Sequence, residues 1–220
     1  MAPLALDTSR TAYQQLRLPA LLLVFQTLLW IAVVAFVVVS GGVPTDPSQA
    51  WTDAARSVIA SKWIIWHLLV VLPHLCGIVA MAMIARTLLR TEAQIMAWAT
   101  LASTAIAVVC ALVWMNLGIA MLHIGAPTLA ELWVDQARTV LIVFWDALML
   151  CATITTGFAL RQTGLARRAG LVVAVLSVLV LPLGLFRPPF VYGLLWLPLG
   201  IALLRRRSVQ RAIDSAQVVG

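Results

Sequence analysis

Six long apolar runs constrain the fold of this 220-residue chain more than any other feature. A helix rises 1.5 Å per residue, so about 20 apolar residues cross the hydrocarbon core of a bilayer. Hydrophobic residues make up 63% of the sequence and charged residues 10%, whereas soluble domains have roughly half and a quarter. We therefore predict an all-α, multi-pass membrane helix bundle with six transmembrane helices, over residues 18–40, 63–85, 95–121, 139–160, 169–186 and 188–204.

The predicted domain organisation is a single six-helix transmembrane domain over residues 18–204. Residues 1–17 would form a cytoplasmic or interfacial segment, and residues 205–220 a basic cytoplasmic tail. The first apolar run is longer than the roughly 7–15 residues of a signal-peptide core, so we expect it to stay as a helix. The last two runs are short and proline-rich, which leaves a re-entrant hairpin over 169–204 as an alternative to two full spans.

The net charge of +7 indicates topology rather than nucleic-acid binding. Cytoplasmic loops of membrane proteins carry an excess of Lys and Arg. With the N-terminus inside, eleven of the 15 basic residues fall in inner segments, so both termini are predicted to be cytoplasmic. The arginine-rich composition favours a bacterial cell membrane. The outer loops 40–62 and 123–138 have helical spacing and are predicted to form short surface helices.

Polar side chains recur seven residues apart in three successive predicted spans. Residues seven apart return to nearly the same face of a helix. Polar groups are costly in hydrocarbon, so we expect each face to turn toward neighbouring helices in the outer half of the bilayer. The polar faces comprise His67 and His74 in the second span, Asn116 and His123 in the third, and Thr139, Asp146 and Thr153 in the fourth.

Pro73 stands directly before the second histidine, in the stretch "WHLLVVLPHLCG". Proline has no N–H, so the helical hydrogen bond to the carbonyl of Leu69 is lost one turn above His74. Within a membrane, a neighbouring side chain or a water must satisfy that carbonyl. The pattern therefore predicts a polar cavity near His74, between the second, third and fourth spans.

Asp146 is the only acidic residue well inside a predicted span. A buried carboxylic acid can donate a proton to an apolar substrate, and aromatic faces stabilise cations. We therefore predict Asp146 as a catalytic acid with His67, His74 and Asn116 as its partners. The predicted substrate-binding residues are Trp63, Trp66, Trp114, Trp145 and His123.

These residue types are similar to those of small membrane-bound terpene cyclases. The resemblance implies an enzyme that cyclises or isomerises an isoprenoid-type lipid by acid catalysis. Residues 164–207, with a basic turn, a hairpin containing "RPPF" and a closing apolar helix, resemble the end of uncharacterised six-helix bacterial integral membrane proteins. That second resemblance implies a membrane location and no particular activity.

Two other functions stay open. The polar faces would serve helix packing or a solute path in a non-catalytic carrier or accessory subunit. Three histidines and one aspartate would suit a metal or haem site, although the sequence has no H-x-x-x-H or H-E-x-x-H spacing. We predict no metal and no cofactor. The expected partners are a lipophilic substrate, membrane lipid, and either a second copy or a membrane subunit, without nucleic acid.

Overall fold

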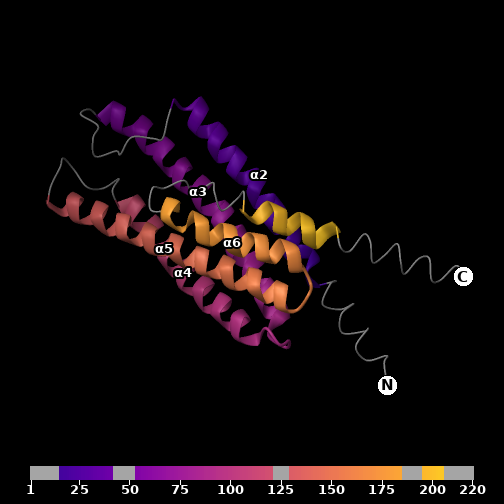
Figure 1. The fold of residues 1–220 in the computed structure, drawn as a ribbon. Helices are drawn as coiled ribbons and strands as arrows, with labels where there is room; N and C mark the ends of the chain where they lie inside the picture. The colour runs from indigo at the N-terminus through magenta and orange to yellow at the C-terminus, as the bar shows by residue number, and fades with distance from the viewer. Residues whose placement is uncertain (1–14, 42–52, 121–128, 185–194, 206–220) are drawn as a thin grey trace, which may run out of the picture.

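The computed structural model describes residues 15–41, 53–120, 129–184 and 195–205, and all regular structure in these residues is helical (Figure 1). The all-α prediction is therefore confirmed for the described part of the chain. The helices are α2 (Arg17–Val39), α3 (Asp53–Leu88), α4 (Gln94–Ala120), α5 (Leu129–Gln162), α6 (Arg167–Gly184) and a short apolar helix, Leu195–Arg205.

In the described residues, four helical segments are long and apolar enough to cross a membrane, namely Arg17–Val39, Ser61–Leu88, Gln94–Ala120 and Trp133–Gln162. They coincide with the first four predicted spans, which supports a multi-pass membrane protein. The last two predicted spans correspond to α6, of 18 residues, and to the shorter helix Leu195–Arg205. The "RPPF" turn between these two helices lies outside the described residues, and their crossing of the bilayer stays a prediction.

The two long spans α3 and α5 begin well before their apolar runs. α3 has 36 residues and α5 has 34, so each is longer than a bilayer requires. The short surface helices predicted in loops 40–62 and 123–138 are therefore wrong as separate elements in the described part. Their described residues instead form the first turns of α3 and α5, because no proline or glycine interrupts either helix there.

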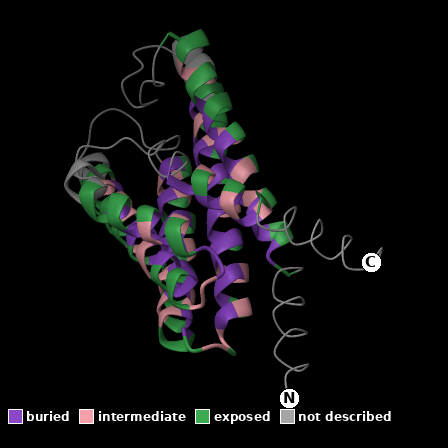
Figure 2. Cartoon of the chain, turned by 45° about the vertical axis from the view of Figure 1, so that its right-hand side comes forward, coloured by how far each residue is buried: buried purple, intermediate pink, exposed green. Residues whose placement is uncertain are grey.

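The helices pack in chain order, α2 on α3, α3 on α4, α4 on α5 and α5 on α6, and α3 also contacts α5. Buried residues gather where helices face one another, and the outer faces carry exposed apolar side chains such as Leu28, Val109 and Val140 (Figure 2). Exposed apolar faces of this kind suit lipid as the surrounding solvent. Among the described residues, five tryptophans are buried: Trp30, Trp63, Trp114, Trp145 and Trp196.

The connections α3–α4 and α5–α6 lie at the same end of the bundle as the start of α2 and the end of Leu195–Arg205 (Figure 1). In the described residues, this end carries the arginines that were assigned to the inner side: Arg17, Arg86, Arg90, Arg161, Arg167, Arg168 and Arg205. The charge distribution and the packing thus agree on which helix ends belong together. The leaflet that this end faces stays a prediction.

Two glycines allow α5 and α6 to cross closely. A Cβ on Gly157 would lie 2.5 Å from the carbonyl oxygen of Gly170, and a Cβ on Gly170 would overlap the carbonyl of Gly157. Small residues at a crossing let two membrane helices approach backbone to backbone. The turn that leads into this crossing contains Gly164, whose φ of +72° is strained for residues with a side chain.

Candidate functional site

Both histidines of α3 lie inside the bundle, each with 2% of its surface exposed. In each ring, Nδ1 lies 2.8 Å from the backbone carbonyl four residues earlier, that of Trp63 for His67 and that of Val70 for His74. A carbonyl only accepts hydrogen bonds, so Nδ1–H is the donor in both rings. In a neutral imidazole, Nε2 is then the acceptor. The two rings therefore present an acceptor nitrogen to the helices that surround α3.

An outer cluster forms around His67 and consists of Trp63, His67, Trp114 and Arg138. Nη2 of Arg138, on α5, donates to Nε2 of His67 over 2.9 Å. The guanidinium carbon of Arg138 lies 5.0 Å from the ring centroid of Trp63 and 5.3 Å from that of Trp114. The His67 ring stacks on Trp114 at 4.7 Å. An arginine that is only 8% exposed is thus held by one imidazole and two indole faces.

Gly118 of α4 closes the outer cluster. Its carbonyl accepts a hydrogen bond from Nε1 of Trp63 over 2.9 Å. A Cβ at Gly118 would lie 2.5 Å from Nε2 of His67, the atom that accepts from Arg138. The absence of a side chain at this position therefore makes room for the contact between His67 and Arg138.

A central cluster forms two turns further along α3, around His74, and consists of Trp30, His74 and Trp145. The rings of Trp30 and His74 meet edge to face at 5.0 Å, and His74 and Trp145 meet at 4.2 Å. Trp145 also contacts Trp114 at 6.0 Å, which joins the central cluster to the outer one. Side chains from α2, α3 and α5 therefore converge on the His74 ring.

Several buried polar groups of α2 and α5 have no hydrogen-bond partner among the described residues. They are the indole N–H groups of Trp30 and Trp145 and both amide atoms of Gln26. Gln26 is fully buried and lies four residues before Trp30, hence on the same face of α2. Membrane interiors offer no water to such groups, and each normally finds a partner within the protein or a ligand.

The C-terminal helix is anchored just below the central cluster. Nε1 of Trp196 donates to the hydroxyl of Thr153 over 2.9 Å, and that hydroxyl donates to the carbonyl of Met149 over 2.7 Å. A Cβ on Gly77 of α3 would overlap the Trp196 ring. Trp196, which is fully buried, thus joins the short helix to α3 and α5 at once.

The structure brings together five of the predicted site residues: His67, His74, Trp63, Trp114 and Trp145. Trp66 is half-buried and packs against the core without a place in either cluster. Their roles in binding or catalysis stay predictions.

The remaining predicted site residues are Asn116, His123 and Asp146. Asn116 was expected to turn toward the histidines, but it is exposed, and its Nδ2 donates to the carbonyl of Leu112 over 2.8 Å. His123 lies outside the described residues. Asp146 is half-buried and directly follows Trp145 of the central cluster in α5, and its role as a catalytic acid stays a prediction.

The helix continues through Pro73, which is buried within α3. The His74 ring bonds the carbonyl of Val70, and what satisfies the carbonyl of Leu69 stays a prediction. The His74 ring lies in contact with the Trp30 and Trp145 rings. The polar cavity expected near His74 stays a prediction.

Arg138 is the functional candidate that sequence reasoning missed. It was assigned to an outer loop because it stands one residue before the apolar run 139–160. The structure places it within the spanning segment Trp133–Gln162, where it is buried. A signal for this placement was available, since Arg138 lies seven residues before Trp145 and therefore on the same face of α5.

In the described residues, no three His, Cys, Asp or Glu side chains are grouped so that they could hold a metal ion. No protein-family model, no curated protein and no solved structure matches this chain.

Proposed function

We propose that this protein binds a lipophilic molecule that carries oxygen acceptors, at the central cluster of Trp30, His74 and Trp145. The observation that carries the proposal is the set of buried donors without partners among the described residues: the N–H groups of Trp30 and Trp145 and the amide of Gln26. A buried donor without an acceptor costs about 1–3 kcal/mol. A ligand oxygen placed among these groups would remove that cost.

The chemistry of the cluster narrows the class of ligand. Indole and imidazole faces offer broad apolar contact, which suits a ring or an unsaturated chain. A pure hydrocarbon has no acceptor for the N–H groups of Trp30 and Trp145. Gln26 offers an acceptor as well as a donor, so a hydroxyl or a carbonyl would both be accommodated. An oxygenated isoprenoid-type lipid fits these requirements.

The proposal is tested by identifying what the protein retains on purification. The full chain is purified in a mild detergent, and the organic extract is analysed by mass spectrometry. We expect a lipophilic oxygen-containing compound with the wild type, reduced at least about tenfold in Gln26→Leu and Trp145→Phe, which corresponds to about 1.4 kcal/mol. Trp98→Phe is the matched control, because Trp98 is exposed on α4.

Two outcomes would contradict the proposal. One is an extract that is identical for the wild type and both variants. The other is a raised melting temperature in Gln26→Leu and Trp145→Phe with no change in the extract, which would show that the donors are simply unsatisfied.

A second candidate is acid catalysis on the same bound lipid, with Asp146 as proton donor. It is favoured by the position of Asp146, which is half-buried within a spanning segment and directly follows Trp145 of the central cluster. The lipid retained by the wild type is incubated with membranes that contain each protein, and its products are followed by mass spectrometry. We expect Asp146→Asn to retain the lipid and lose conversion. Equal conversion by Asp146→Asn would remove the acid role.

A further inference from the structure

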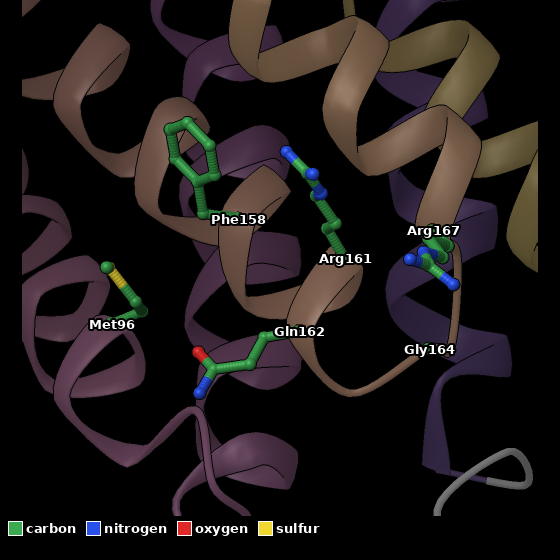
Figure 3. A pocket seen from close by; sticks show the side chains of 6 residues that line it. All are labelled: Met96, Phe158, Arg161, Gln162, Gly164 and Arg167. Carbon is green, nitrogen blue, oxygen red and sulfur yellow. The ribbon is translucent and has the colours of Figure 1, made fainter.

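A hollow of about 510 Å³ lies at the α5–α6 turn, at the opposite end of α5 from Arg138. Its lining comes from α4, the end of α5, the turn and the start of α6 (Figure 3). The lining residues are Met96, Phe158, Arg161, Gln162, Gly164 and Arg167. Its size is within the range of about 300–1,000 Å³ that is typical of ligand pockets.

The rim of this hollow is held in place by neighbouring elements. Nε2 of Gln162 donates to the backbone carbonyl of Glu92 over 3.1 Å, which ties the end of α5 to the α3–α4 connection. Gly164 takes a φ of +72° in the turn that follows. In Figure 3, Gln162 points to the α4 side, where Met96 lies, Arg161 extends from the end of α5 toward the level of Phe158, and Arg167 lies at the start of α6.

The lining combines cationic and apolar side chains. Arg161 and Arg167 are both exposed, and a guanidinium offers a planar fork of N–H donors that matches the oxygens of a phosphate. Phe158 is 38% exposed, and Met96 is half-buried on the facing helix. Phe158 and Met96 belong to spanning segments, so their side chains face the region where acyl chains run.

A second hollow adjoins the first and extends the positive surface. It is lined by Ala166, Arg167, Arg168, Ala169 and Ala202. Arg167 therefore lies between two hollows, with Arg168 beside it. The acidic residue of this region, Glu92, is exposed and contributes its backbone carbonyl to Gln162.

We propose that the α5–α6 hollow binds an anionic phospholipid, with its phosphate on Arg161 and Arg167 and an acyl chain along Phe158 and Met96. Basic pockets between membrane helices at the cytoplasmic side suit anionic headgroups. The site is independent of the central cluster, because none of its residues belongs to that cluster. It assigns a specific function to two of the arginines that otherwise indicate only topology.

The probe is dioleoylphosphatidylglycerol, added to the full chain in detergent, and native mass spectrometry counts the lipid molecules retained. We expect Arg161→Gln/Arg167→Gln to weaken retention about tenfold, since two charge-assisted contacts are lost. The matched control is Arg86→Gln/Arg90→Gln, an exposed arginine pair at the α3–α4 connection, which should retain lipid like the wild type. An equal loss in both pairs would overturn the proposal, because charge alone would then explain binding.

Two further arms test the ligand class. Dioleoylphosphatidylcholine has the same acyl chains and phosphate but no net charge, and we expect clearly weaker retention. Displacement of the bound lipid by millimolar inorganic phosphate would overturn the lipid assignment, because the acyl wall would then contribute nothing. Should the double variant fail to fold, Arg167→Gln alone is used, and unchanged retention by it would count against the site.

Discussion

Nη2 of Arg138 on α5 donates to Nε2 of His67 on α3 over 2.9 Å, and both side chains are buried within spanning helices. This contact requires a neutral His67, since a protonated ring would turn a second donor toward the guanidinium. The guanidinium also lies over the indole faces of Trp63 and Trp114. A charge that is costly in hydrocarbon thereby becomes a cross-link between α3, α4 and α5.

Removing the guanidinium should weaken the bundle. We expect Arg138→Gln to lower the free energy of unfolding by about 2 kcal/mol, because a hydrogen bond to a charged group and two cation–π contacts are lost. The measurement is unfolding in detergent micelles with increasing denaturant. Arg86→Gln, at an exposed position, should change stability by less than about 0.5 kcal/mol. Equal effects of the two substitutions would contradict the role assigned to Arg138.

Adding one methyl group at Gly118 should disturb the same contact. Replacing glycine by alanine in a helix normally stabilises it by about 1 kcal/mol, so the sign of the effect is informative. A Cβ there would lie 2.5 Å from Nε2 of His67, and we expect Gly118→Ala to destabilise by about 1–3 kcal/mol. The His67→Ala background should remove most of that cost. A stabilising Gly118→Ala would show that the ring has room to move.

A second steric prediction follows from the close approach of Gly77 to the Trp196 ring. We expect Gly77→Ala to destabilise by about 3 kcal/mol, because the added carbon would overlap an indole that is fully buried. Trp196→Leu should restore tolerance to alanine at position 77, so the double variant should be more stable than Gly77→Ala alone. Thermal unfolding of the four proteins measures this coupling. Strictly additive effects would contradict a direct contact.

The hydroxyl contact between α4 and α5 should contribute little. Thr100 and Thr155 meet through their Oγ1 atoms at 2.8 Å, and Thr100 also donates to the carbonyl of Met96. We expect Thr100→Val to cost about 0.6 kcal/mol, the average for polar contacts between membrane helices. Thr87→Val is the control, because the Thr87 hydroxyl bonds the carbonyl of Met83 on its own helix. A loss above about 2 kcal/mol would contradict this prediction.

The apolar runs predicted α2 to α5 well, because length and hydrophobicity alone decide whether a helix can span a bilayer. The shared face of His67 and His74 was predicted for a similar reason, since helical periodicity relates positions on one element. Both rings are buried, as expected for polar groups kept away from lipid.

Helical periodicity did not determine how each helix is rotated about its own axis, and therefore which of its faces turns toward its neighbours. Asn116 is exposed because α4 turns Trp114 and Gly118 inward instead. Arg138 was misplaced because a hydropathy boundary assigns a charged residue to a loop. The contact of Trp196 with Gly77 joins residues far apart in the sequence, and no local sequence pattern predicts it.

The space that Gly77 leaves for the Trp196 ring also bears on how the bundle assembles. Trp196 is synthesised after α3, α4, α5 and α6, so the space beside Gly77 is filled only when the last described helix packs. A chain that is truncated before residue 195 would leave the Thr153 hydroxyl without the indole that bonds it. A polar hydroxyl left exposed in the bilayer in this way would distinguish the truncated chain from the full bundle.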